Sequence, residues 1–309
     1  MSKQLLEETF DKLSSQPYSW KLYFVKIDRR SDNPFTTYKV RFKNNNYLIK
    51  YAESLLNMVK KNQIKEIEAV KEYTGDNSKV SCDKLNIDNV LIKEQWDYLV
   101  ETVGKSVDEK IEGKYQAYIL EGEPIERGQV SVIMVKVSNP IVKLENKRNA
   151  VFRYTESNEL DALSDEICKL YMNIDFVVLQ RNLYSFNYKF EELFHMEKTM
   201  QKIKARAMEQ ILEIDAFADS EKFSELAKCY KSPRTFITLK QERIDRLVDE
   251  DSRVKVAKLL KIPVDENGKL NISTEKEANL FIKYLCFKIF QEAETNDLLE
   301  ATSVSKIIR

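Results

Sequence analysis

The chain has 309 residues, which is enough for one large or two ordinary domains. Hydrophobic residues make up 43% and charged residues 32% of it, a balance that excludes intrinsic disorder for most of the chain. The 50 basic and 50 acidic residues cancel, and with only six glycines and six prolines the composition disfavours glycine-rich cofactor folds and β-sandwiches with many turns.

The first half of the chain predicts helices and strands in alternation. Leu6, Phe10 and Leu13 stand at helical spacing and predict an amphipathic helix over residues 3–14. Aromatic and β-branched residues then predict a hairpin, with strands over residues 18–28 and 36–43. Further elements expected in this half are helices over 47–60 and 92–103, a strand over 64–73, and a second hairpin over 114–121 and 129–137.

A polar stretch over residues 143–149 has no large apolar cluster, and we expect the domain boundary there. The N-terminal domain would then cover residues 1–145 and contain the basic, aromatic-rich hairpin. The C-terminal domain would cover residues 146–309 and be mostly helical after residue 190. Together these elements predict the α+β class, with antiparallel hairpins packed against long helices.

The second half is expected to contain the longest helix of the chain. From Leu193 onward, apolar residues such as Met196, Met200 and Ile211 recur at three- and four-residue steps over about six turns. Other elements expected here are strands over 175–180 and 183–188, helices over 220–229 and 241–260, a strand pair over 261–272, and a helix opened by a capping box from Thr274 to Glu277.

Charge is segregated although its total is zero, because residues 21–61 contain ten basic and three acidic residues. Lys39, Arg41 and Lys43 alternate along a predicted strand, which places the three cations on one face, about 6.6 Å apart. Arg29 and Arg30 lie in the turn of the same hairpin. This pattern suits contact with a nucleic-acid backbone, and a solvated strand face over an aromatic core is the alternative explanation.

A second group of cations lies on the predicted long helix. Lys198, Lys202 and Arg206 are four residues apart and form a basic ridge that suits phosphate contacts. Glu197 and Glu209 share the helix, so an ordinary exposed charged face is the alternative. A third basic cluster surrounds Ser232-Pro233 and indicates no function by itself; it comprises Lys228, Lys231, Arg234, Lys240 and Arg243.

Signatures of catalysis are scarce in the sequence. The single histidine, His195, excludes most histidine-based metal sites and hydrolytic triads, and the four cysteines include no Cys-x-x-Cys pair. One alternative stays open: Glu66, Glu68 and Lys71 could form a metal-dependent nuclease site, although 50 acidic residues produce such matches by chance. We therefore predict no catalytic residue, no metal ion, no cofactor and no small-molecule substrate.

The sequence also bears on cellular location. No run of about 18 apolar residues is present, so we expect no membrane-spanning helix. Acidic residues follow soon after the first methionine, which argues against a signal peptide and predicts a cytoplasmic protein with reduced thiols.

Three short segments within residues 174–215 carry a family resemblance. They read Ile-Asp-Phe-Val-Val-Leu-Gln, then Asn-Leu-Tyr-Ser-Phe-Asn, then Lys-Phe-Glu-Glu-Leu-Phe at the start of a long helix. With the segment 226–229, the strand pair over 261–272 and the helix start over 273–277, the second half resembles the B-subunit (KwaB-like) family of the Kiwa anti-phage defence system. The first half matches that family only in size and in its order of elements.

The resemblance implies a bacterial defence protein that binds DNA and blocks phage replication or expression. It also implies a small membrane-embedded partner subunit, which would hold the protein at the inner membrane face, and we expect a homo-oligomer. No catalytic motif is carried over from the family, so the DNA contacts proposed above follow from charge placement alone. A metal-dependent nuclease of the same system and a scaffold that binds only protein are the alternatives.

Overall fold

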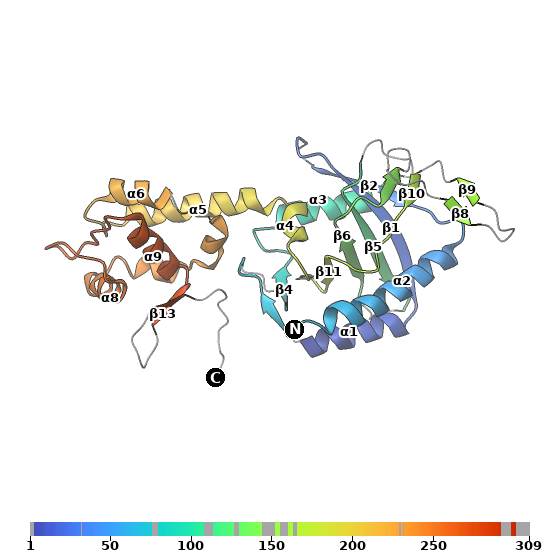
Figure 1. Cartoon of the computed structure of the whole chain (residues 1–309), viewed down its shortest axis with the longest axis horizontal. Helices are drawn as coiled ribbons and strands as arrows, with labels where there is room; N and C mark the ends of the chain where they lie inside the picture. Colours follow the sequence, from blue (N-terminus) through green and yellow to red (C-terminus); the bar gives the residue numbers. More distant parts are fainter. Residues whose placement is uncertain are drawn as a thin grey trace. The chain divides into compact units, whose positions relative to one another are not determined.

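The computed structural model of the chain describes residues 3–31, 33–75, 80–107, 114–126, 130–143, 152–154, 160–162, 166–228, 230, 232–291 and 298–300. A mixed sheet and several helices confirm the α+β class. The chain forms two compact units, each described here by itself (Figure 1). Unit 1 comprises Met1–Glu72 and Ser78–Phe194, and unit 2 comprises Tyr73–Asn77 and His195–Arg309.

Unit 1 is built on an eight-stranded sheet in the order β2-β1-β5-β6-β11-β12-β4-β3. All neighbours pair antiparallel except β3 and β4, which are parallel. The strands are β1 (Tyr18–Ile27), β2 (Phe35–Val40), β3 (Ala69–Glu72), β4 (Ser81–Asn86), β5 (Ala117–Pro124), β6 (Val132–Lys136), β11 (Phe176–Leu179) and β12 (Asn182–Ser185). Two short pairs, β7 (Ile141–Lys143) with β10 (Glu166–Cys168) and β8 (Phe152–Tyr154) with β9 (Leu160–Ala162), lie outside this sheet.

Two helices cover one face of the sheet. They are α1 (Lys3–Ser15) and α2 (Asn45–Val59), which run side by side (Figure 1), and α2 continues into a π-helical turn, η1 (Lys60–Ile64). Alternate residues of the central strands, such as Leu22 and Leu120, share one buried cluster with Leu6 and Leu55 of these helices. The apolar residues of α1 thus form a buried face against the sheet, as their spacing in the sequence predicts.

The opposite face of the sheet packs against α3 (Lys93–Gly104) and α4 (Lys189–Leu193). The ring of Phe194 lies 5.7 Å from that of Phe176 on β11 and 6.3 Å from that of Trp96 on α3, measured between centroids. These three aromatic residues are buried, so they fix both helices to this face.

Unit 2 is mostly helical around a phenylalanine core. The stacked rings of Phe217 and Phe223 lie 4.2 Å apart, and Phe281 meets both rings edge-on. The elements are α5 (Met196–Glu213), α6 (Ser220–Lys228), η2 (Pro233–Thr238), α7 (Gln241–Asp245), α8 (Glu250–Leu260), α9 (Glu275–Leu285), β13 (Ile289–Gln291) and β14 (Leu298–Glu300). In this unit α6 lies beside α5, and α9 packs against α6 (Figure 1).

In the second half of the chain, three predicted elements differ in the structure. The long helix is interrupted, because His195 adopts a left-handed backbone (φ 51°) between α4 and α5. The helix predicted over 241–260 is divided into α7 and α8, since Asp249 caps a new helix by accepting a hydrogen bond from the Ser252 N–H. The strand pair predicted over 261–272 is reduced to one bridge, between Val264 and Leu270.

The division between the compact units also differs from the predicted domain boundary. Residues 144–151, where the sequence predicts that boundary, lie outside the described residues. The strands on either side of this stretch pair directly, with Val135 of β6 opposite Phe176 of β11. Unit 1 therefore continues past residue 145 as far as Phe194.

Candidate nucleic-acid interface

The hairpin cations do not form the expected single strand face. β2 ends at Val40, so only Lys39 lies on the strand, and Arg41 and Lys43 are exposed residues that follow it. The strand ends because the chain turns into α2, where Asn44 caps the helix by accepting a hydrogen bond from the Asn46 N–H (2.9 Å).

Arg29 and Arg30 are found where the sequence predicts them, in the turn of the β1–β2 hairpin, and both are exposed. The turn is closed by a hydrogen bond from the Asp28 N–H to the carbonyl of Pro34 (2.7 Å). The Asp28 carboxylate accepts a further bond from the backbone N–H of Arg30 (3.0 Å). An acidic group therefore lies at the base of this basic turn, which reduces its positive field.

Lys39 does not lie on a basic face. It lines a cavity that contains both basic and acidic side chains. The cavity has a volume of about 360 Å³ and lies between α3 and the sheet of unit 1. Its polar lining includes Lys21, whose ammonium group lies 2.7 Å from Glu123 and 4.0 Å from Glu121. Glu121 also accepts a hydrogen bond from the hydroxyl of Tyr23 (3.1 Å). Two carboxylates in the same cavity as Lys39 make this position unfavourable for a polyanion.

The α5 ridge, defined as Lys198, Lys202 and Arg206, is formed as the sequence predicts. All three residues are exposed on α5, and none forms an ion pair within the part of the chain that the structure describes. The buried residues of α5 lie on the opposite face; they are Met196, Met200, Ala207 and Ile211. The ridge therefore presents to solvent three cations that form no ion pair among the described residues, and the exposed Glu209 lies on the same face, one turn from Arg206.

Lys204, next to the ridge in sequence, has a different role. Its ammonium group donates a hydrogen bond to the carbonyl of Tyr230, and burial lowers the pKa of Lys204. Lys204 thus connects α5 to the segment before η2 and is not part of the exposed ridge.

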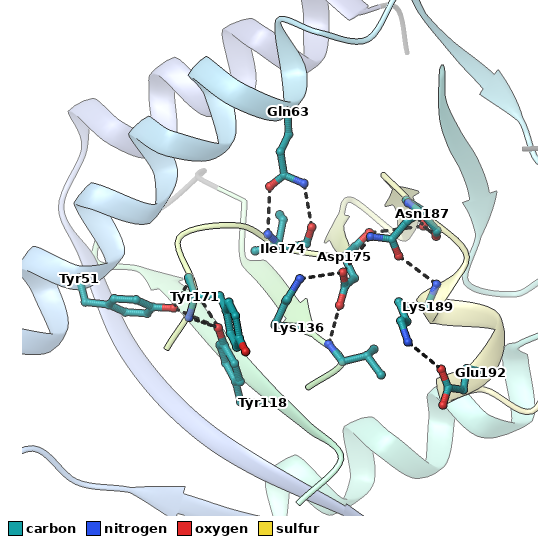
Figure 2. Close-up of polar contacts among 12 residues, drawn as sticks. Tyr51, Gln63, Tyr118, Lys136, Tyr171, Ile174, Asp175, Asn187, Lys189 and Glu192 are labelled. Atoms are coloured by element: carbon teal, nitrogen blue, oxygen red, sulfur yellow. Dashed lines mark hydrogen bonds and ion pairs between the residues drawn. The ribbon is translucent and has the colours of Figure 1, made fainter. Parts of the chain in front are cut away.

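A buried carboxylate that the sequence analysis did not single out lies at the start of β11. Asp175 is only 2% exposed, and its carboxylate lies 3.0 Å from the ammonium group of Lys136 (Figure 2). The same carboxylate accepts hydrogen bonds from the backbone N–H of Val137 (2.7 Å) and the side chain of Asn187 (2.8 Å). These contacts join the ends of β6, β11 and β12, so this site is best explained as structural.

The segment that precedes β11 is held by a second polar group (Figure 2). The hydroxyl of Tyr51 donates to the carbonyl of Tyr171 (2.9 Å), and the Tyr171 N–H donates to the hydroxyl of Tyr118 (2.7 Å). The side-chain amide of Gln63 pairs with both backbone groups of Ile174. Three elements that are distant from it in sequence, α2, η1 and β5, therefore fix this segment.

A buried acidic pair lies between the sheet and α4. Asp83 on β4 is 2% exposed and Glu191 on α4 is 8% exposed. Burial and the charge of Glu191 raise the pKa of Asp83 to about 7, and Lys71 on the neighbouring strand opposes the shift. Two carboxylates in one buried region cannot both ionise without cost, so Asp83 is protonated more readily than an exposed aspartic acid.

The residues of the nuclease alternative are not brought together on a strand. Glu66 and Glu68 are exposed and precede β3, and only Lys71 lies on that strand. Within the described parts of the chain, no group of three histidine, cysteine or acidic residues is placed to hold a metal ion. Nor does any helix in those parts have the length and apolar character needed to cross a membrane.

Comparison with known proteins places the chain in a family. A family model described as "Kiwa protein KwaB-like" matches residues 116–288, more than half of the chain. This range begins one residue before β5 and extends beyond α9, so it includes parts of both units. A search of curated proteins gave no match, and a search of solved structures gave none either. The chain therefore belongs to the KwaB-like family of the Kiwa anti-phage defence system.

Proposed function

We propose that this protein is the DNA-binding effector of a Kiwa defence complex and that it blocks phage replication or expression without cutting DNA. The observation that carries the proposal is the α5 ridge, whose three exposed cations have no acidic partner among the described residues. Family membership supports the defence role. A membrane-embedded partner subunit, which would hold the protein at the inner membrane face, and a homo-oligomeric state belong to the same proposal.

The geometry of the ridge suits a polyanion. From Lys198 to Arg206 the helix rises about 12 Å, at 1.5 Å per residue, so the three cations can meet several phosphates of one duplex. Ion pairing with phosphates releases counterions, and this makes the affinity for DNA strongly dependent on salt. The hairpin residues Arg29, Arg30, Arg41 and Lys43 are a second proposed contact group, whereas Lys39 contributes less because of its acidic neighbours.

The test is a titration of duplex DNA at several salt concentrations, read by fluorescence anisotropy. The variant Lys198→Gln/Lys202→Gln/Arg206→Gln is expected to bind at least about tenfold more weakly and to lower the log–log salt slope by about 0.9 for each phosphate that is no longer neutralised. The matched control is Lys222→Gln/Lys255→Gln/Lys258→Gln, which removes three exposed cations elsewhere in unit 2. Equal losses of affinity in the two variants would contradict a specific role for the ridge.

The two alternatives give different results in the same preparation. A nuclease would cleave plasmid DNA when magnesium or manganese is added, and cleavage by the wild-type protein would overturn the noncatalytic proposal. A scaffold that binds only protein would assemble normally with its partner subunit and show no affinity for DNA even at low salt.

A further inference from the structure

Two cations of unit 2 are held against aromatic rings at the end of α9. The guanidinium carbon of Arg243 lies 4.7 Å from the ring centroid of Tyr284 and 4.1 Å from that of Phe287. The ammonium group of Lys240 lies 5.7 Å from the centroid of the same Phe287 ring. We call Lys240 and Arg243 the stacked pair. Both belong to the third basic cluster, to which the sequence alone gives no role.

The aromatic rings that support the stacked pair are fixed by the backbone. Phe287 has a φ of 59°, a left-handed conformation that is rare and unfavourable for a bulky residue. The fold maintains it through two hydrogen bonds, from the Thr238 hydroxyl to the carbonyl of Cys286 (2.7 Å) and from the Phe287 N–H to the carbonyl of Tyr284 (3.1 Å). The backbone that carries the Phe287 ring therefore has a defined conformation in the protein without a ligand.

The stacked pair has no acidic partner. Within the described residues, neither the guanidinium of Arg243 nor the ammonium of Lys240 forms an ion pair or donates a hydrogen bond. Arg246, one turn further along, differs because it pairs with Glu242. Lys240 is exposed and Arg243 is partly exposed, so solvent reaches both groups. Two like charges near one ring, without a carboxylate between them, favour the binding of an anion.

The chemistry of the pair indicates which anion fits. A guanidinium stacked on rings keeps its N–H edge free for two parallel hydrogen bonds to an oxyanion, and a nearby ammonium adds further donors and a second charge. A phosphate monoester carries a charge of about −1.5 to −2 near pH 7, which matches two cations, whereas a carboxylate or a phosphodiester carries only one charge. We infer that the stacked pair is a binding site for a phosphate monoester, such as the 5′-phosphate of a nucleotide.

This inference goes beyond DNA binding by the α5 ridge and is tested separately, by isothermal titration calorimetry of the full chain at low salt. Adenosine 5′-monophosphate and inorganic phosphate are expected to bind, and adenosine is not. Adenosine 3′,5′-cyclic monophosphate, a diester with one charge, is expected to bind about tenfold more weakly than the monoester. Equal affinity for adenosine and its monophosphate would overturn the inference.

Variants then assign the binding to the stacked pair. Arg243→Gln is expected to weaken binding of adenosine 5′-monophosphate by about tenfold or more, and Arg243→Lys to weaken it as well, because lysine has no planar fork. Lys240→Gln changes an exposed residue and gives a second readout if Arg243→Gln fails to fold. Arg246→Gln, which removes a paired cation of the same segment, is the control and should bind as wild type does.

Two results would reject the site. Unchanged affinity for the monophosphate in both Arg243→Gln and Lys240→Gln would show that the phosphate binds elsewhere. Loss of duplex DNA binding in Arg243→Gln, with monophosphate binding unchanged, would show that Arg243 binds phosphodiesters. If the α5 ridge variant binds DNA as wild type does, only the proposed function is contradicted. Monophosphate binding does not involve that ridge, so the inferred site would be unaffected.

Discussion

The carboxylate of Asp175 connects the ends of several strands through its ion pair and hydrogen bonds. Its replacement by alanine leaves the partly buried ammonium group of Lys136 without a counter-charge, and it leaves the Val137 N–H and the Asn187 amide without their acceptor. We expect Asp175→Ala to lower the free energy of unfolding by about 3–5 kcal/mol, measured by urea denaturation.

A matched control for Asp175→Ala is available on the surface of the same unit. Asp88→Ala also removes a carboxylate from an ion pair, in this case with Arg181 (2.6 Å), but both partners are exposed. Exposed pairs contribute little to stability, so this variant should unfold at nearly the wild-type urea concentration. Similar midpoints for Asp175→Ala and Asp88→Ala would show that burial of the Asp175 pair is not what makes it important.

Asp83 gives the protein a specific dependence of stability on pH. Its pKa is raised to about 7 in the folded state and is near 3.8 when the chain is unfolded. The folded state therefore binds the proton more tightly, and the stabilisation that this gives is present below about pH 4 and is lost as the pH rises through 7. Asp83→Asn, which cannot ionise, should gain stability relative to wild type between pH 5 and 8.

The measurement for Asp83 is a series of urea denaturation curves at pH values between 4.5 and 8, for wild type and Asp83→Asn. The difference between the two free energies of unfolding should grow as the pH rises and should level off above the folded-state pKa. Parallel pH profiles would contradict a raised pKa at Asp83. The charge of Glu191 contributes to the raised pKa of Asp83. In the Glu191→Gln background, the difference between the two free energies of unfolding should therefore level off at a lower pH.

At the scale of elements, the start of α9 is predicted in full from the sequence, because the capping box from Thr274 to Glu277 forms in the structure. The side chain of Thr274 accepts a hydrogen bond from the Glu277 N–H (3.3 Å), and the Glu277 carboxylate accepts one from the Thr274 N–H (3.0 Å). Thr274→Ala should reduce the stability of unit 2 by about 1 kcal/mol, measured by chemical denaturation, because it removes the cap.

The control for this cap is Thr274→Ser, which keeps a hydroxyl at the same position and should retain most of the stability. Hydrogen exchange would show where the effect lies, with faster exchange expected in the first turn of α9. Exchange that changes equally throughout unit 2, without a larger effect at this turn, would indicate that the cap does not act locally.

Other elements show why local patterns are only a partial guide. The 36–43 strand pattern continues past Val40, but the cap at Asn44 ends the strand early, and so the three alternating cations do not share a face. The helical period from Leu193 to residue 214 is unbroken in sequence, yet the left-handed backbone of His195 separates two helices. The periodicity of apolar residues indicates which side chains are buried. It does not indicate a single residue at which the backbone changes direction.

The basic ridge on α5 was predictable because it depends only on one helix and its four-residue spacing. The cavity around Lys39 and the stacked pair were not, because each joins residues from several elements. The same holds for Asp175, whose partners come from β6 and from the turn after β12. Contacts of this kind depend on tertiary structure, which spacing along the chain does not describe.

At the scale of the molecule, long-range strand pairing explains how the chain divides into units. β11 and β12 follow the polar stretch in sequence, but they occupy places in the sheet between β6 and β4. The polar stretch therefore lies between elements of unit 1, and the division between the compact units lies after α4. The family match includes parts of both units, so neither unit alone accounts for the similarity.

The short segment Tyr73–Asn77 comes from the first half of the chain but belongs to unit 2. Gly75 shows how tightly it fits, since a Cβ atom there would lie 3.1 Å from the Cβ of Arg234, and its φ of 78° disfavours other residues. During translation this segment leaves the ribosome long before residues 195–309, into which it packs. Until those residues are made, Gly75 lacks the unit 2 partner against which it packs, so this segment acquires its final contacts only after the whole of unit 1 has been synthesised.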